Sequence, residues 1–315
     1  MSALAFTIVA LVLIGPVPAM LARASWPMRA PRAAIVLWQS IVLAAVLSAF
    51  SAGIAIASRL FVPGTDGRPT ATITSEIAIL GWPMWLLLVF VFALTLLIGA
   101  RLIVSVLQVA IATRRRRAHH RMMVDLLDMP RTSVLDDVCS TADLRVLDVA
   151  QPMAYCLPGM RSRVVVSDGT LTSLAGDEIA AILTHERAHL RARHDLVLEM
   201  FTAVHAAFPR FVRSGSALDA VRLLIELLAD DAAVRAAGPT PLARALVACA
   251  SGRTPSGALA AGGPTTVIRV RRLAGRPNSP LLAAVAYLAA VAVLVVPTVA
   301  VAVPWLTELH RLFTT

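Results

Sequence analysis

The sequence predicts an α-helical integral membrane protein with four transmembrane helices and an α+β domain inserted between the third and the fourth. Three observations predict this fold class. Hydrophobic residues make up 58% of the 315-residue chain and charged residues only 15%, whereas about a quarter of a soluble domain is charged. Four stretches have the roughly 20 apolar residues that cross a hydrocarbon core. The segment between the last two stretches holds most of the acidic residues and all but one of the histidines.

The apolar stretches divide the chain into three regions. Residues 1–113 are expected to hold three transmembrane helices, with a cytosolic extension of the third helix. The first stretch lacks a basic leading region, so we interpret it as a retained helix and not as a signal peptide. Residues 281–315 are expected to form the fourth helix and a short external tail. The four predicted helices cover residues 3–22, 33–58, 77–99 and 281–303.

Basic residues at the ends of the stretches indicate their orientation. Arg114 to Arg117 follow the third stretch, and RVRRLAGR (269–276) precedes the fourth. Because basic flanks face the cytosol, residues 114–280 are expected in the cytosol and both termini outside the cell membrane. Aromatic residues are only 5% of the chain and do not alternate with the arginines. We therefore expect the partner of these arginines to be the lipid bilayer, with no direct nucleic acid binding, and the oligomeric state stays open.

The inserted region, 114–280, is expected to begin with strands and continue with helices. Short runs of β-branched residues bounded by turn residues predict strands, and apolar residues at helical spacing predict helices. A stretch rich in Gly, Ser, Pro and Thr predicts a connector. The strands are expected within 143–150, 152–157 and 163–169, the helices from Asp177 onward, over 217–237 and over 241–252, and the connector over 251–266.

The first of these helices carries the motif HERAH. His185 and His189 stand four residues apart and therefore face the same way on a helix, as two ligands of one zinc ion do. Glu186 lies beside them, where it can take a proton from a water that the metal activates. Glu186 also falls on the apolar stripe of the helix, and a carboxylate there is costly unless its charge is compensated. The motif therefore predicts a zinc site with Glu186 as the general base.

A later helix brings further acids to an apolar face. Glu226 interrupts the apolar repeat of 217–237, and Asp230 follows it by four residues on the same side. A carboxylate in such a place commonly orients a ligating imidazole. Asp230 is our candidate for this role, with Asp231 and Asp195 as competing choices.

Taken together, these parts resemble the membrane-embedded zinc metallopeptidases of the BlaR/MecR type, the β-lactam-sensing antirepressors. The likeness covers the four stretches, the insert, the strand RVVVSDG, the helix EIAAILTHERAHLRARHDLVL and the later ELLADDAA. It implies a zincin-like metallopeptidase domain over 114–280. It also implies one Zn²⁺ per chain with His185, His189 and Glu226 as ligands, Glu186 as the general base, and Asp230 holding a ligand in place.

The resemblance also suggests a substrate. Members of this family carry a penicillin-binding sensor domain after the last transmembrane helix, and only a dozen residues follow Val303 here. We therefore do not expect the chain to sense β-lactams directly. The expected function is cleavage of a cytosolic regulator, such as a winged-helix repressor, or of the chain itself, in a signalling response.

The same features are compatible with two other functions. The chain could be a CAAX-processing or heat-shock-type membrane metallopeptidase, which shares HExxH and a later acidic pair. It could also be a non-catalytic membrane signalling protein with a structural zinc site.

His194 and Asp195 are expected to end the helix that carries the motif. Arg101 is expected to extend its side chain to the lipid headgroups.

Overall fold

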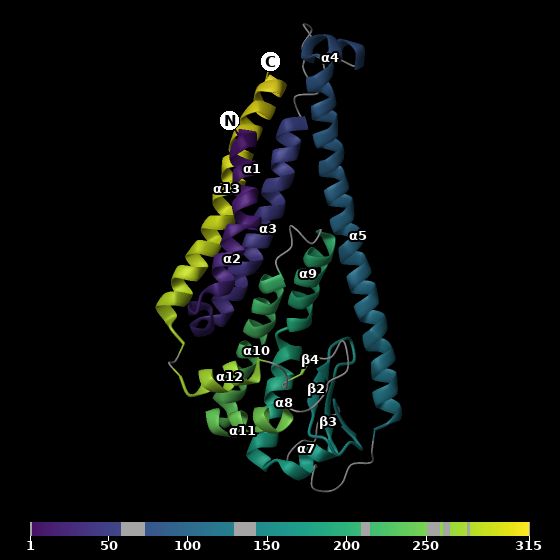
Figure 1. Cartoon of the computed structure of the whole chain (residues 1–315), viewed down its shortest axis with the longest axis vertical. Helices are drawn as coiled ribbons and strands as arrows, with labels where there is room; N and C mark the ends of the chain where they lie inside the picture. The colour runs from purple at the N-terminus through teal and green to yellow at the C-terminus, as the bar shows by residue number, and fades with distance from the viewer. Residues whose placement is uncertain are drawn as a thin grey trace.

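The computed structural model describes residues 2–57, 73–128, 143–208, 215–250, 259–260, 265–275 and 278–314. The protein is mostly helical and elongated. Long apolar helices gather at one end, and a small sheet with shorter helices lies at the other, as Figure 1 shows. One helix, α5, runs beside both parts.

Four helices within the described residues are long and apolar enough to cross a membrane. They correspond in place to the four predicted stretches, although residue 58, the predicted end of the second, lies outside the described residues. The first is bent, because α1 and α2 meet at Gly15, and the short η1 separates it from the second. The elements concerned are α1 (Ser2–Ile14), α2 (Pro16–Arg23), η1 (Trp26–Arg29), α3 (Pro31–Ala57), α5 (Trp82–Leu126) and α13 (Pro280–Thr314).

The third apolar helix differs from its expected bounds of 77–99. A separate short helix, α4 (Ile73–Leu80), precedes it, and α5 begins only at Trp82. Gly81 has a φ of +76°, which breaks the helix, and Pro83 in the first turn suits a new start. With 45 residues, α5 is about 68 Å long at 1.5 Å per residue. The expected extension to Thr113 therefore continues to Leu126, far beyond the length that a bilayer covers.

The sheet has four strands in the order β1-β3-β2-β4. The central strand β3 pairs in parallel with β1, and β2 is antiparallel to both of its neighbours. Three strands lie within the predicted ranges, whereas β4 lies in the segment expected to be a connector. The strands are β1 (Leu144–Leu147), β2 (Ala154–Leu157), β3 (Arg163–Ser167) and β4 (Leu259–Ala260).

Six helices complete this end of the molecule. The helix that carries the HERAH motif, α8, packs on the sheet and against α10, and their shared core includes Ile182, Val164 and Ala233, all fully buried. The predicted helices from Asp177 onward, over 217–237 and over 241–252 correspond to α8, α10 and α11. The helices are α7 (Asp168–Ser173), α8 (Gly176–Arg191), α9 (His194–Ala207), α10 (Gly215–Ala237), α11 (Pro239–Cys249) and α12 (Thr266–Leu273).

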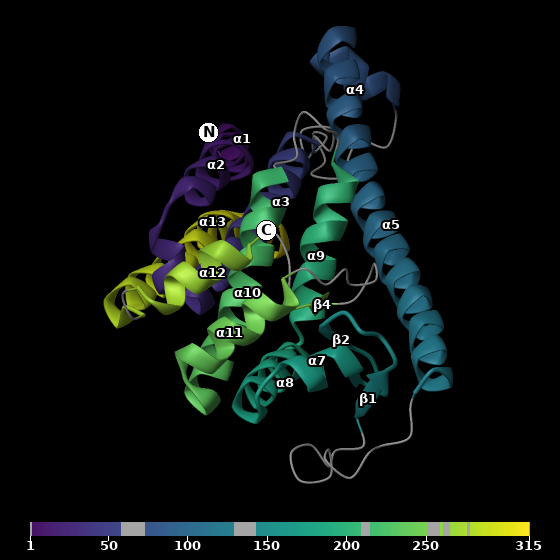
Figure 2. The same cartoon turned by 60° about the horizontal axis from the view of Figure 1, so that its bottom comes forward.

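Two of these helices reach from the sheet to the apolar helices. In Figures 1 and 2, α9 lies beside α5, and α10 extends from the sheet towards α3. The Arg101 Nε donates to the carbonyl of Ala207 at 2.7 Å, and the Ser105 hydroxyl donates to the carbonyl of Ala203 at 2.7 Å. The Arg101 guanidinium thus caps the end of α9 while its side chain stays exposed, and its extension to the headgroups stays a prediction. The apolar helices and the sheet end are one packed body.

Gly169, the second residue of α7, provides a test of the packing between α7 and the segment that follows β1. The N–H of Gly169 donates to the carbonyl of Val149 at 3.0 Å, and a Cβ at Gly169 would overlap the backbone of Ala150. We expect Gly169→Ala to lower the free energy of unfolding by about 1–3 kcal/mol, as overpacking does. Gly176→Ala is the matched control, since nothing lies within 4 Å of its new Cβ. Chemical denaturation of both proteins in detergent measures the difference, and equal stabilities would contradict the close approach.

Candidate metal centre

The helix α8 carries its polar motif on a buried face. Acids in its first turn suit the helix dipole, and Glu178 Oε2 accepts a hydrogen bond from the N–H of Ala175 at 3.0 Å. The face that begins with apolar side chains continues through His185, Glu186 and His189, each at most 1% exposed. Three polar side chains therefore lie where the core would otherwise be apolar, and each needs a compensating partner.

The structure brings His185 and His189 together with Glu226 of α10. The two Nε2 atoms are 3.2 Å apart. The Glu226 carboxylate reaches both rings, with Oε2 3.4 Å from the His185 Nε2 and Oε1 3.6 Å from the His189 Nε2. Tetrahedral ligands at 2.0–2.1 Å from a zinc ion stand about 3.3–3.4 Å from one another. Each of these separations is close to the ligand spacing of a zinc tetrahedron, with the two imidazoles nearest to different oxygens of the Glu226 carboxylate.

Each imidazole has a partner on its other nitrogen. Asp230 Oδ1 lies 3.0 Å from the His185 Nδ1, so it accepts the Nδ1 proton and leaves Nε2 free to bind a metal. The Nδ1 atoms of His189 and His194 are 3.0 Å apart. With Nε2 of His189 facing the metal position, its Nδ1 donates and the Nδ1 of His194 accepts.

The sequence predicted that His194 and Asp195 end α8, and this prediction is wrong. The helix ends at Arg191, Arg193 takes a left-handed conformation with φ +52°, and α9 begins at His194. This turn directs the His194 ring back to His189. Of the competing acids, Asp195 pairs with Arg117 of α5 at 3.0 Å. Asp231 pairs with Arg272 at 2.7 Å, whereas Asp230 is the acid in contact with the His185 ring.

Arg269, which lies in α12 and is 1% exposed, belongs to this centre although its sequence pattern did not indicate it. Its Nε donates to Asp230 Oδ2 at 2.8 Å, and its Nη1 is 3.0 Å from Glu226 Oε2. We assigned it to a basic membrane flank because it belongs to the run RVRRLAGR. Nothing in that run separates the buried Arg269 from the exposed Arg271. Only the folded helix shows which arginine turns inward.

Charge balance supports a divalent cation in this place. Glu186, Glu226 and Asp230 contribute three negative charges around one guanidinium, Arg269, which leaves an excess of two. Burial raises the pKa of Glu186 to about 8. Burial alone would lower the pKa of His185, but hydrogen bonds to Asp230 and Glu226 outweigh it and raise this pKa to about 9. Protonation of both Glu186 and His185 would neutralise the cluster. One divalent cation with both imidazoles neutral would do the same.

Glu186 has the surroundings of a group that acts on a ligand. Its side chain is fully buried, and neither carboxylate oxygen has a hydrogen-bond partner of ordinary geometry among the described residues. The thiol of Cys156 in β2 interacts with the same carboxylate. A buried carboxylate whose described donor is only a weak thiol is unusual in a folded protein, and a water held at the adjacent metal position would supply a stronger donor.

Comparison with known proteins adds one finding. The model of peptidase family M48 matches residues 113–277, just over half of the chain, and this match includes every residue of the metal centre. No curated protein and no solved structure matches the chain. The match supports a metallopeptidase, while the narrower likeness to the BlaR/MecR type stays a prediction.

The contact between Asp230 and His185 predicts a graded loss of zinc. We expect Asp230→Asn to weaken zinc affinity about 10–100-fold, as the loss of an orienting carboxylate does, and Asp231→Asn to leave it unchanged. His185→Ala and Glu226→Ala should abolish stoichiometric binding. Competition with a chelator, followed by elemental analysis of the purified proteins, measures these affinities. A weaker affinity in Asp231→Asn than in Asp230→Asn would refute the assignment.

The buried arginine predicts a loss of stability. Arg269→Met would leave Glu226 and Asp230 without their guanidinium, so we expect a loss of about 3–5 kcal/mol in the free energy of unfolding. Arg271→Met, two residues along the same helix, removes an exposed charge and should change stability by less than about 0.5 kcal/mol. Denaturant titration of the metal-free proteins compares the two variants. A similar stability for both would mean that the Arg269 ion pairs contribute nothing.

Proposed function

The chain belongs to peptidase family M48, and from this premise we propose that it is an integral-membrane zinc endopeptidase whose active site faces the cytosol. The observation that carries the proposal is the grouping of three candidate metal donors, with the buried carboxylate of Glu186, which lacks a hydrogen bond of ordinary geometry, beside the two histidines. A structural zinc site is normally closed by four protein ligands, whereas a catalytic site has three and keeps one position open. The group found among the described residues has three, which favours the enzyme over a structural site.

Each residue of the centre has a chemical task in this proposal. His185, His189 and Glu226 would hold the zinc ion, which supplies a Lewis acid for the attacking water and the scissile carbonyl when it is bound. Glu186 takes a proton from the water and later passes it to the leaving amine. Asp230 fixes the tautomer of the His185 ring, and burial around the site excludes competing water.

The proposed membrane placement follows from charge and helix length. The four apolar helices would cross the bilayer, with both termini outside and residues 114–280 in the cytosol. The run Arg114 to Arg117 supports this orientation, since it lies on α5 directly beyond the apolar part of the helix. Arg117 is turned inward to Asp195 and Glu199, whereas the three arginines before it are exposed.

For the substrate, we propose a cytosolic regulatory protein, such as a winged-helix repressor, or the chain itself. The likeness to the BlaR/MecR type motivates this choice. Cytosolic proteins from cells that make the wild-type chain can be compared with those from cells that make Glu186→Gln. New amino termini on a transcriptional regulator, found only with the wild type, would support the proposal. If cleavage products arise only from membrane or secreted proteins, the choice of substrate is wrong although the enzyme stands.

Replacement of the general base separates catalysis from metal binding. We expect Glu186→Gln to keep one zinc ion per chain and to lower the rate of peptide cleavage at least 10²-fold, since general-base catalysis contributes about 10²–10⁴-fold. Asp177→Asn makes the same acid-to-amide change on an exposed side chain of α8 and should cleave at the wild-type rate. Elemental analysis and hydrolysis of a fluorogenic peptide measure both properties. Undiminished cleavage by Glu186→Gln would refute the role of Glu186.

A further inference from the structure

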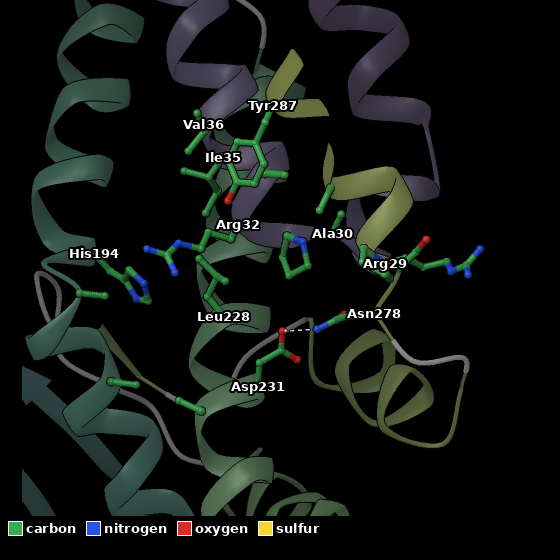
Figure 3. Close-up of a pocket in the computed structure, with 18 of the residues that line it drawn as sticks. Arg29, Ala30, Arg32, Ile35, Val36, His194, Leu228, Asp231, Asn278 and Tyr287 are labelled. Carbon is green, nitrogen blue, oxygen red and sulfur yellow. Dashed lines mark hydrogen bonds between the residues drawn. The ribbon is translucent and has the colours of Figure 1, made fainter. Parts of the chain in front are cut away.

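A cavity lies close to the metal centre, since its lining includes His194, whose ring is against His189. The cavity has a volume of about 950 Å³ and lies between the first turns of α3 and α13, the end of α8 and one face of α10. Figure 3 shows Arg32 of α3 and His194 pointing towards each other across it, with Leu228 and Tyr287 on other sides. The catalytic proposal uses none of its residues except His194.

The cavity has an excess of positive charge. Arg29, Arg32, Arg191 and Arg235 line it. Arg29 is half-buried, whereas the other three are exposed, and none of these three has an ion pair within the described part of the chain. The acid that lines the cavity, Asp231, is already neutralised, because it accepts hydrogen bonds from Arg272 at 2.7 Å and from Asn278 at 2.9 Å. Three guanidinium groups therefore remain for an anion.

Two long helices add to this positive field. The first residues of α3 and α13, Pro31 and Pro280, both line the cavity. The first N–H groups of a helix have no partner inside the helix, and the dipole makes this end positive. Both helices direct such an end to the same space. Each helix begins with a proline, which has no N–H, and the Leu282 N–H donates to the Ser279 hydroxyl at 3.4 Å. The helices therefore contribute mainly their dipoles, and an anion with several acceptor oxygens, such as a phosphate, suits this field and the arginines.

The remaining walls are apolar and continue into the apolar helices. Ile35 and Val36 come from the second turn of α3, and Ala283 and Tyr287 from the first turns of α13. Both helices are candidate membrane spans, which begin at Pro31 and at Pro280. The cavity thus lies where a membrane meets water, whichever side of the membrane that is. A ligand in it would place a charged group among arginines and a hydrocarbon chain along the helices.

From this combination we propose that the cavity is a binding site for one anionic phospholipid. Its phosphate contacts Arg32, Arg191 and Arg235, and its acyl chains lie along Ile35, Val36 and Tyr287. This inference goes beyond peptide cleavage and does not depend on it, since the walls of the cavity hold neither the metal donors nor Glu186. A neutral phospholipid has the same chains without the net charge, so it should bind less well.

The test uses the whole chain purified in a neutral detergent. Phosphatidylglycerol or phosphatidylcholine with the same acyl chains is added, and native mass spectrometry counts the bound lipids. We expect one phosphatidylglycerol per chain, at least about tenfold preferred over phosphatidylcholine. The triple change Arg32→Gln, Arg191→Gln and Arg235→Gln should remove this preference. The matched control changes Arg114, Arg115 and Arg116 to Gln, which removes the same charge from exposed positions on α5 and should keep the preference.

The outcomes separate the cavity from general attraction to negative lipids. An equal loss in both triple variants would overturn the proposal, because the binding would then reflect surface charge alone. Complete displacement by an equal concentration of glycerol 1-phosphate would also overturn it, since a free anion and not a lipid would be the ligand. Zinc content and the melting transition show whether the triple variant is folded. If it is not, Arg32→Gln is compared with Arg114→Gln, and a loss of about fivefold is expected for the first alone.

Discussion

The structure depends on placing three carboxylates and two imidazoles in the space between α8 and α10. Such a cluster is unfavourable in a core unless its charges are matched. Arg269 supplies one positive charge through its contacts to Asp230 and Glu226, and a divalent metal is suited to supply the other two. The folding of this region and its affinity for metal are therefore linked quantities. Burial of the cluster is also what makes it useful, because it keeps Glu186 away from bulk water.

The sequence was most informative where one helix determines the geometry. Residues four apart on a helix face the same way, so His185 and His189 could be paired without knowledge of the fold, and their burial follows from the apolar stripe. Glu226 was accessible through a resemblance and through its place on an apolar face. Arg269 and His194 were not, because their roles arise from tertiary contacts: one depends on how α12 docks on α10, and the other on a left-handed turn at Arg193. The continuous length of α5 was underestimated, since the sequence pattern marks the end of the apolar part and not the end of the helix.

The apolar helices and the metal centre are joined through charged as well as apolar contacts. Arg117 of α5 binds Asp195 and Glu199 at 3.0 Å and 2.7 Å. Asp195 directly follows His194, whose ring contacts His189. On the other side, the Val221 and Ile225 side chains of α10 belong to the same core cluster as Trp38 of α3. One arginine of the run from which we predict the membrane orientation thus also contacts the first two turns of α9. The charge pattern of the sequence could suggest only the first of these roles.

The two halves of the metal site are secured by different physical means, and this determines how changes elsewhere reach it. His185 and His189 belong to one helix, so the distance between them is set by local helix geometry and survives small movements of α8 as a whole. Glu226 belongs to α10, whose position depends on its packing against α3 and α8. A shift of α10 would move Glu226 and Asp230 together, since they are one turn apart, and would alter both the proposed third ligand and the partner of the His185 Nδ1. The metal centre is therefore more sensitive to the packing of α10 on α3 than to any change confined to the HERAH helix outside its motif.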